Sequence, residues 1–410
     1  MSIGSLLPEA EARPLLWSIL MIDSTFARLA LLLAPLAIGC AFAADSKAAD
    51  ELVWFGTYTR GSDSEGIYVA RFNTENGTLS EPTLAAELVN PSFLARHPSK
   101  PLLYCVSEIE DLDGKRTGGI TALSIDPSTG KLTKINERPS LGAGPCQVSV
   151  DPSGQCVVAA NYGGGSSVCM AIRDDGGLEP AVDGVPGGFV QHEGSSVNPQ
   201  RQQGPHAHCA RISPNGAFVL VPDLGIDLVL VHKLNPEKGT IEPTSAGVVP
   251  PGSGPRHLAF TKNGKRVYVI NELALTVTGF DFDAEEGTLV PFQTVSTLPD
   301  EITDREGFST AEVVIHPSGR FLYGSNRGHH SIAMFEINQA DGQLTLLGVE
   351  QIRGKTPRNF NISPDGRWLL AGGQDSDTVT VFAIDAETGR LRFTDQTVSV
   401  PKPVCICFDR

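Results

Sequence analysis

The sequence predicts an all-β fold made of repeated units, and three observations support this prediction. Turn-forming residues are abundant, with 43 Gly and 29 Pro among 410 residues, and this composition favours many short strands over long helices. Alternating apolar runs, typical of half-buried strands, lie on both sides of similar tight turns. These turns recur at intervals of about fifty residues, which indicates a repeat architecture.

Six similar segments each join two apolar runs through a tight turn, with Pro or a substitute at the first corner and Gly, Asn or Lys at the second. They are HPSKPLLY (97–104), DPSGQCVV (151–158), SPNGAFVL (213–220), TKNGKRVY (261–268), HPSGRFLY (316–323) and SPDGRWLL (363–370). A third strand and a second hairpin turn follow, as in KLNPEKGTIEP and AIDAETGRLRF. Each unit therefore has four antiparallel strands, which is typical of a propeller blade.

The two ends of the chain complete a seventh unit. Residues 52–82 supply the later strands of a blade without its first strand, and KPVCICF (402–408) resembles such a first strand. Pairing the two ends removes the exposed sheet edges that a linear array would leave. The sequence thus predicts a single seven-bladed β-propeller domain over residues 51–410.

The first fifty residues are excluded from this domain, because they have the layout of a secretory signal. In the segment that begins at Met21, Arg28 precedes an apolar run at 29–38, and small residues follow at Ala41 and Ala43. The run is too short for a comfortable transmembrane span. We therefore expect an exported protein, periplasmic or secreted; the alternative is an N-terminal helix packed on the domain of a cytoplasmic protein.

The same segment leaves two further alternatives open. Since the signal-like layout begins at Met21, a translation start there, and not at Met1, is consistent with the sequence. LAIGC (36–40) is an imperfect lipoprotein-type cleavage box, so a lipid-anchored form is an alternative to an unanchored one.

The charge and the cysteines restrict the possible partners and the cross-links. The formal net charge of −15 at pH 7 argues against nucleic acid or an anionic membrane surface, since either would need a basic face. An anionic ligand would have to be held by local arginines. The seven cysteines after Cys40 are scattered through strand-like apolar runs, so we expect buried thiols and no disulfide framework. The oligomeric state is left open by the sequence.

Equivalent positions in the repeats distinguish scaffold from site. Counting back from each first turn aligns Ser92, Cys146, His208, Arg256, Ala311 and Arg358. A purely structural position would hold one residue type, whereas small residues here alternate with His and Arg. Because the innermost strands line the channel of a propeller, these cations would crowd one channel mouth and repel unless an anion binds there.

A second set of equivalent positions follows the second strand of each unit. It comprises Ser107–Glu108, Asn161–Tyr162, Asp223–Leu224, Asn271–Glu272, Asn326–Arg327 and Gly373–Gln374. The first member is often Asn or Asp, which suits a turn that satisfies its own backbone. Taken singly these residues fit solvated loop ends, but both sets fall at the same end of the strands and together favour a site.

The motifs in this part of the chain resemble those of a known family. NPQRQQGPHAHCARISPNGAFVLVPDLG (198–225), GPRHLAFTKNGKRVYVINEL (254–273) and AEVVIHPSGRFLYGSNRGHHSIAMF (311–335) are similar to successive blade motifs of the seven-bladed propeller lactonases. That family includes 6-phosphogluconolactonases of the propeller type and the fungal 3-carboxymuconate-lactonizing enzyme. The resemblance covers about 52–408 and implies a catalytic set that falls here on His206, His208, Arg256, Glu272 and Arg327.

Lactone opening requires a water made nucleophilic and a donor for the oxyanion that develops. A neutral histidine or an ionised Glu272 can take the proton, and Arg256 or Arg327 can hold the oxyanion. Arginine also grips phosphate or carboxylate in bidentate fashion. His208 is in register with Arg256 and is the preferred base; His206, two residues earlier on an extended strand, would face the same way.

Further residues near the two sets are expected to bind substrate. They are Arg201, Glu108, Tyr162, Asp223, Asn271, Asn326, Arg358 and Gln374. No metal or cofactor is expected, because His329 and His330 lack a third ligand at a matching spacing. Gly163–Gly165 likewise lacks a phosphate-loop pattern.

Three functions fit these residues. The leading one is hydrolysis of a sugar lactone, of the 6-phosphogluconolactonase type, with a small and anionic substrate. The second is a carboxymuconate cycloisomerase-like, lactonizing activity. The third is a non-enzymatic binding propeller, since a fold does not imply a chemistry. A cytosolic sugar-phosphate enzyme would not have a signal-like segment, so the sequence leaves the identity of the native lactone open.

Overall fold

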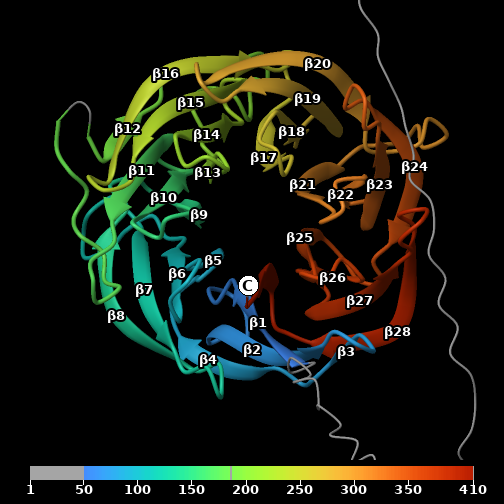
Figure 1. The fold of residues 1–410 in the computed structure, drawn as a ribbon, viewed down its shortest axis with the longest axis horizontal. Coiled ribbons are helices and arrows are strands. Elements are labelled where there is room, and N and C mark those ends of the chain that lie inside the picture. Colours follow the sequence, from blue (N-terminus) through green and yellow to red (C-terminus); the bar gives the residue numbers. More distant parts are fainter. Residues whose placement is uncertain (1–49, 185–186, 410) are drawn as a thin grey trace, which may run out of the picture. The chain divides into compact units, whose positions relative to one another are not determined.

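The structure is a computed structural model, and it describes residues 50–184 and 187–409. In these residues the chain forms 29 β-strands and no helix. The strands make seven antiparallel sheets that follow one another around a ring (Figure 1). The predicted all-β, seven-bladed propeller is thereby confirmed, and no described helix is long and apolar enough to cross a membrane. The predicted signal segment and lipoprotein box lie outside the described residues.

Six blades take four consecutive strands each. In chain order they are β5 (Leu94–Arg96), β6 (Leu102–Ser107), β7 (Gly119–Ile125) and β8 (Leu132–Pro139); β9 (Pro145–Val150), β10 (Cys156–Asn161), β11 (Ser166–Ala171) and β12 (Phe189–Gln191); β13 (Arg211–Ile212), β14 (Phe218–Asp223), β15 (Leu228–Asn235) and β16 (Thr240–Val248); β17 (Pro255–Phe260), β18 (Arg266–Asn271), β19 (Thr276–Asp283) and β20 (Thr288–Ser296); β21 (Ser309–Ile315), β22 (Phe321–Arg327), β23 (Ser331–Ile337) and β24 (Leu344–Gln351); β25 (Pro357–Ile362), β26 (Trp368–Gly373), β27 (Thr378–Ile384) and β28 (Leu391–Ser399).

The seventh blade joins both ends of the described chain, as predicted. Its innermost strand is β29 (Pro403–Phe408), which pairs antiparallel with β1 (Asp50–Thr57). β1 pairs in turn with β2 (Gly66–Asn73), and β2 carries the short outer strands β3 (Thr78–Leu79) and β4 (Thr83–Glu87). This pairing closes the ring without a free inner edge.

The first turn of each blade is fixed by a local side chain. In DPSGQ the buried Asp151 carboxylate accepts the backbone N–H groups of Ser153, Gln155 and Cys156. Gly154 completes this turn at φ 74°, a left-handed conformation that favours glycine. The turn chemistry that the sequence predicts is therefore present, and it sets where each inner strand ends.

Aromatic side chains lock neighbouring blades together. Polar tips of buried or half-buried rings donate hydrogen bonds to backbone carbonyls in a turn of the next blade around the ring. These are Trp54 to Gly130, Tyr104 to Gly176, Tyr268 to Gly342, Tyr323 to Gly389 and Trp368 to Thr74. The apolar core lies in the same blade interfaces, and the seven described cysteines are buried and free, as predicted.

Candidate active site

The candidate site lies on the face of the propeller where the innermost strands of the blades begin. A cavity of about 170 Å³ is lined there by Glu108, Cys146, Tyr162, Arg201, His208, Glu272, Arg327 and Arg358. A smaller chamber adjoins it and is lined by Ser92, Phe93, Glu108, Cys146, His208, Arg256, His257, Arg358, Asn359 and Val404. Four residues line both spaces, so the two predicted sets of positions converge on one continuous site.

Irregular pairing at the start of five inner strands, β9, β17, β21, β25 and β29, directs side chains into this site. In β17 the register shifts between Pro255 and His257, so Arg256 is an extra residue in the strand. Such a bulge re-aims side chains next to functional sites. Arg256 and His257 consequently both line the chamber, although they are consecutive. β25 has the same shift just at Arg358.

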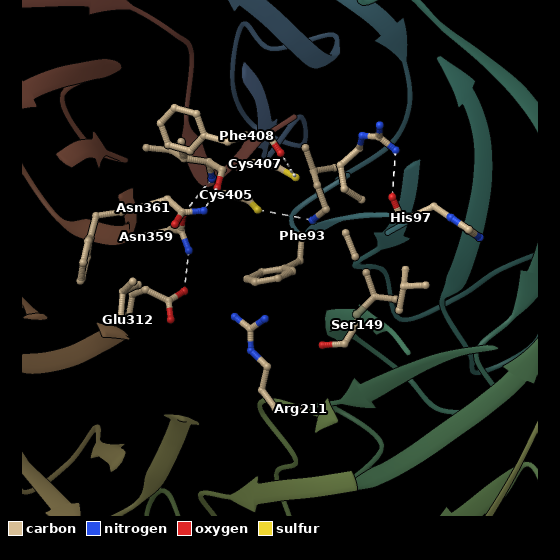
Figure 2. A pocket seen from close by; sticks show the side chains of 18 of the residues that line it. Phe93, His97, Ser149, Arg211, Glu312, Asn359, Asn361, Cys405, Cys407 and Phe408 are labelled. Atoms are coloured by element: carbon tan, nitrogen blue, oxygen red, sulfur yellow. Dashed lines mark hydrogen bonds between the residues drawn. The ribbon is translucent and has the colours of Figure 1, made fainter. Parts of the chain in front are cut away.

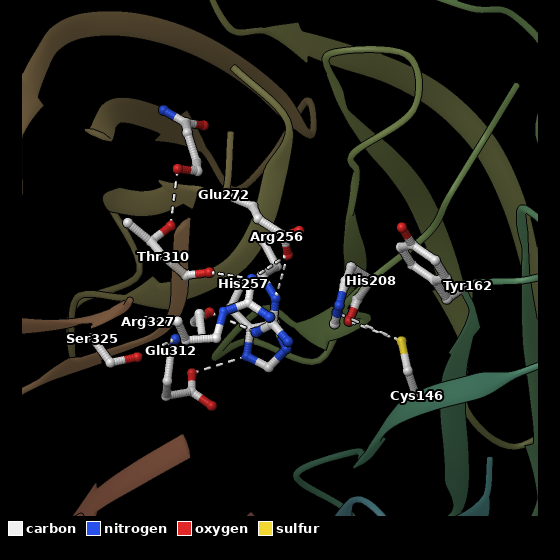
Figure 3. Close-up of polar contacts among 12 residues, drawn as sticks. Cys146, Tyr162, His208, Arg256, His257, Glu272, Thr310, Glu312, Ser325 and Arg327 are labelled. Carbon is white, nitrogen blue, oxygen red and sulfur yellow. Dashed lines mark hydrogen bonds and ion pairs between the residues drawn. The ribbon is translucent and has the colours of Figure 1, made fainter. Parts of the chain in front are cut away.

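The carboxylate of Glu272 is held by three arginines, of which Figure 3 shows Arg256 and Arg327. Its Oε1 lies 2.7 Å from Nη2 of Arg201, and its Oε2 lies 2.9 Å from both Nε of Arg256 and Nη2 of Arg327. Burial works to raise the pKa of Glu272, but the three guanidinium groups lower that pKa to about 2. Glu272 is therefore ionised, firmly bound and a weak base.

Arg256 and Arg327 are committed to the protein as well as to Glu272. Nη1 of Arg256 donates to the carbonyl of Ala311 at 2.7 Å, and Nη2 of Arg327 donates to the carbonyl of Thr310 at 2.8 Å. Burial lowers the pKa of Arg327 to about 10, which still leaves it charged at neutral pH. These two guanidinium groups fix the shape of the site.

Arg358 differs from the other three arginines. Within the described chain its guanidinium makes no hydrogen bond or ion pair, although it lines both the cavity and the chamber. It lies over the ring of Tyr58, 5.3 Å from the ring centroid. Burial lowers the pKa of Arg358, but the neighbouring Tyr58 and Glu108 more than offset this and raise it. Its N–H groups are thus charged and open to a ligand.

Glu108 faces Arg358 across the same spaces. Its two carboxylate oxygens each lie 2.9 Å from the Tyr58 hydroxyl, and Oε2 also accepts from the Ser92 hydroxyl at 2.5 Å. The predicted placement of Glu108 in the site is observed. Tyr58 was not expected there, because it precedes the first complete repeat. It directly follows β1, the second strand of the closing blade, and is therefore the counterpart of Glu108 and Tyr162 in that blade.

His208 lies in the wall shared by the cavity and the chamber. Its Nδ1 is 3.5 Å from Sγ of Cys146, and its ring packs edge-on against Tyr162 and His257. Burial, followed by the charge of Arg256, holds the pKa of His208 well below its usual range. His208 is therefore a neutral imidazole at neutral pH.

His206 and His208 both contact the ring of Tyr162, but only His208 lines the cavity and the chamber. The segment before β13 is not a regular strand, and Ala207 makes only an isolated bridge with Asp223. His206 stacks on the ring of Tyr162 at 4.6 Å, with Nδ1 3.0 Å from the Tyr162 carbonyl. It supports the wall of the cavity and does not line it. Tyr162 itself contacts Nη2 of Arg201 at 3.1 Å.

Three residues expected to bind substrate instead hold turns from buried positions. Asp223 accepts the backbone N–H groups of His206 and Gly225. Asn271 donates to hydroxyls of Thr276 and Thr278, and Asn326 donates to the Thr297 carbonyl and the Ser331 hydroxyl. None of the three lines the cavity or the chamber. They do what Asn and Asp commonly do where a strand ends.

Gln374 also lies outside the site. Its side chain donates to Asp375, and it lines neither the cavity nor the chamber. His329 contacts the hydroxyl of Ser331, and His330 accepts the backbone N–H of Thr356. Residues 50–184 and 187–409 contain no group of three or more side chains suited to a metal ion.

Two functional candidates were missed by the comparison of repeats. His257 and Glu312 follow Arg256 and Ala311 directly, one residue beyond the aligned positions. Alternation along a regular strand would point them away from the channel, and only the bulges bring them inward. The sequence signal was the unusual pairing of Arg with His in GPRH.

Comparison with known proteins agrees with this geometry. A 6-phosphogluconolactonase of Bacillus subtilis (strain 168) is 39% identical over 355 residues, which cover 87% of this chain and 97% of that protein. A 6-phosphogluconolactonase of Formosa agariphila is 32% identical, with 85% and 96% covered. The solved periplasmic gluconolactonase PpgL of Pseudomonas aeruginosa is 33% identical with a TM-score of 0.81, and the match covers 88% of this chain and 99% of that one. Residues 52–408 match the family model described as lactonase, 7-bladed beta-propeller, and the chain therefore belongs to the seven-bladed β-propeller lactonase family.

Proposed function

We propose that this protein hydrolyses the lactone of an anionic sugar acid, in the manner of a 6-phosphogluconolactonase. The observation that carries the proposal is the charge of the site. Four arginines line the two connected spaces against two glutamates, Glu108 and Glu272. The site is thus more positive than negative in a chain whose formal net charge is −15. The names of the two 6-phosphogluconolactonases support the same substrate class.

The arginines divide the work of holding such a substrate. Arg358 lines both spaces and has uncommitted donors, so it binds the lactone carbonyl and stabilises the oxyanion. Arg201 has a side chain that is 40% exposed and lies beside Tyr162. It is placed to bind a phosphate at the rim. Arg256 and Arg327 orient Glu272, which in turn keeps Arg201 extended.

A neutral histidine, and not Glu272, takes the proton of the attacking water. Three guanidinium groups compete with any proton for the Glu272 carboxylate, so this group accepts one only at about pH 2. The buried imidazoles keep a lone pair at neutral pH. General-base assistance typically contributes about 10²–10⁴-fold, which is sufficient for a sugar lactone.

The test compares substrates and arginine variants of the purified protein. We expect hydrolysis of 6-phosphoglucono-1,5-lactone with a higher kcat/KM than glucono-1,5-lactone, and no cyclisation of 3-carboxymuconate. Arg358→Gln should lower kcat about 10²–10³-fold, because one oxyanion donor is typically worth this much. The matched control is Arg392→Gln, at an exposed residue of β28. Cyclisation in place of hydrolysis, or an unaltered kcat in Arg358→Gln, would contradict the proposal.

We also propose that the protein is exported through its N-terminal segment. The signal-like layout after Met21 supports this, as does the periplasmic description of the Pseudomonas aeruginosa relative. Fractionation of cells that express the chain with and without residues 21–46 tests it. Equal retention of both forms in the cytoplasm would refute export.

A further inference from the structure

His257 and Glu312 form a buried pair beside the chamber. Nδ1 of His257 lies 2.9 Å from Oε1 of Glu312, and the two side chains are only 3% and 2% exposed. The carboxylate is further held by the backbone N–H of Val313 at 3.0 Å and by Nδ2 of Asn359 at 2.5 Å. The imidazole is therefore fixed in orientation by a carboxylate that is itself fixed.

The pair lies between two separate spaces along the axis of the propeller. On one side His257 lines the small chamber with His208 and Arg256. On the other side Glu312 lines a cavity of about 260 Å³ at the opposite end of the inner strands, together with Arg211 (Figure 2). The pair thus forms part of the floor beneath the candidate active site.

The charges determine which nitrogen of His257 carries the proton. Burial raises the pKa of Glu312, but His257 and Arg211 outweigh this effect and hold the pKa below its usual range. Burial lowers the pKa of His257 to about 4. At neutral pH an ionised carboxylate can only accept, so Nδ1 of a neutral His257 carries the hydrogen and Nε2 carries the lone pair.

Nε2 of His257 is a buried acceptor without a hydrogen-bond partner among the described residues. Buried polar atoms are nearly always hydrogen-bonded, to protein or to ordered water. The chamber that His257 lines offers about 10 Å³ to the centre of a water molecule, which is about the space that one water needs. Polar groups of Ser92, Glu108 and Arg358 also line it.

We infer that His257, and not His208, is the general base, and that its Nε2 holds the attacking water in this chamber. The inference rests on the proposed lactone hydrolysis. His208 faces the same space, with ring centroids 5.3 Å apart, and supplies a second contact to the water. Of these two histidines, only His257 has a carboxylate hydrogen-bonded to its other nitrogen, which is the arrangement that activates a base. Glu312 is a positioning residue.

The step balances without any further reactant. The water oxygen forms a bond to the lactone carbonyl carbon while one water proton moves to Nε2 of His257. The oxyanion is held by Arg358. When the tetrahedral intermediate collapses, the bond from the carbonyl carbon to the ring oxygen breaks and the imidazolium returns the proton to that oxygen. The carboxylic acid formed then loses its proton to solvent.

The charged groups around His257 set the pH range of this base. Arg256 on its own strand and Arg211 on β13 oppose its protonation, whereas Glu312 on β21 favours it. The neighbouring His208 stays neutral, and a protonated His257 would lower the pKa of His208 further. His257 is therefore a competent base above about pH 4 and loses this role as the pH falls through that value. Removing the Glu312 charge lowers the pKa of His257 further. In a plot of kcat/KM against pH, the fall on the acid side should therefore move to lower pH, and the maximal value should decrease.

The kinetic test uses three variants. His257→Gln should lower kcat about 10²–10⁴-fold with a much smaller change in KM. Glu312→Gln should lower the plateau and shift the acid limb of kcat/KM to lower pH, measured with unphosphorylated gluconolactone so that no substrate phosphate titrates. The control His316→Gln replaces a buried histidine whose nitrogens contact Ser318 and Gly366 in a turn at the opposite end of the strands, and its kcat should stay within about two-fold. Circular dichroism and thermal melting confirm folding.

A crystal structure at high resolution provides a readout that does not depend on activity. We expect a water at hydrogen-bond distance from Nε2 of His257, and its displacement in His257→Gln. An ordered water in a protein that hydrolyses no lactone would overturn the proposed function and the assignment of a base, while leaving the water site intact. No water at Nε2, or a folded His257→Gln that keeps wild-type kcat, would overturn the inference alone.

Discussion

The described residues contain two buried histidine–carboxylate pairs, which differ in the contacts of the histidine Nε2 atom. In His192–Asp223 the Nδ1 to Oδ2 distance is 2.7 Å, and Nε2 of His192 lies 3.3 Å from the Ser167 hydroxyl. In His257–Glu312 the corresponding distance is 2.9 Å, and Nε2 has no partner in the described part of the chain. In the first pair both ring nitrogens of the histidine are hydrogen-bonded to protein, and we call it the closed pair. In the second, the open pair, Nε2 has no such partner and the histidine lines a polar chamber.

The comparison teaches that the pair itself does not mark a function. Asp223 uses its remaining lone pairs on the backbone of a turn, so the closed pair ties that turn to the next blade. Glu312 likewise has every oxygen occupied, yet its histidine keeps one free acceptor. What separates scaffold from catalysis here is whether the second nitrogen faces a space that a water can enter.

The largest expected difference is that a substitution in the open pair lowers activity, whereas the same substitution in the closed pair lowers stability. His257→Gln should lower kcat about 10²–10⁴-fold, whereas His192→Gln should chiefly destabilise the fold, by about 3 kcal/mol, because it removes one partner of a buried pair. Urea unfolding and lactone hydrolysis, measured on both variants, check this. If His192→Gln lost as much kcat as His257→Gln, the distinction between a closed and an open pair would fail.

The next effect concerns the carboxylate of Glu272, which is held by three arginines. The folded-state pKa of Glu272 is lowered to about 2 from an ordinary value of 4.5, so its ionised form stabilises the fold above about pH 4.5 and this contribution is lost as the pH falls toward 2. The shift corresponds to roughly 3 kcal/mol. Glu272→Gln should abolish this part of the pH dependence, while its activity falls because three arginines lose their anchor.

Urea unfolding at a series of pH values from 7 to 2.5 measures this effect for the wild type and the variant. The wild type should lose stability more steeply below pH 4.5 than Glu272→Gln does. Parallel curves for the two proteins would contradict the assigned environment of Glu272. The exposed Glu387→Gln is a suitable control, because its side chain is 88% exposed.

The fold was predictable because its signals are local and repeated. Turn segments such as DPSG carry the residues that form the turn, and each recurs at a fixed spacing from the alternating strands. The closing blade could be predicted too, since residues 52–82 lacked a first strand that 402–408 supplied. Neither inference required knowledge of contacts between distant residues beyond ring closure.

The site was predictable where a residue stands at an equivalent position of its blade, whether or not that position belongs to a regular strand. Arg256, His208 and Arg358 were found because each occupies an equivalent position in its blade. His257 was missed because a bulge, which depends on the pairing of two strands, turns it inward. Asn271 and Asn326 were assigned to substrate although their residue type equally suited a turn, and only burial separates these two roles.

A smaller effect should separate the exposed arginine of the site from the buried ones. Arg201→Gln should raise KM for 6-phosphoglucono-1,5-lactone about 10-fold, since a hydrogen bond to a charged group is worth roughly 1.5–3 kcal/mol. KM for the unphosphorylated lactone should change by less than about two-fold. Equal effects on both lactones, measured by steady-state kinetics, would mean that Arg201 does not contact the phosphate.

The smallest effect is expected when Nε2 of His192, in the closed pair, loses its hydrogen-bond partner. Ser167→Ala removes the hydroxyl that lies beside Nε2 of His192, so this histidine then resembles His257 in having a far nitrogen without a partner. The loss should be about 1 kcal/mol of unfolding free energy, with kcat unchanged, because this nitrogen lies between strands of its own blade and faces no substrate. Urea unfolding and hydrolysis assays decide the outcome. A fall in kcat of more than about five-fold would show that the closed pair also acts on the site, through the turn that carries His206 and His208.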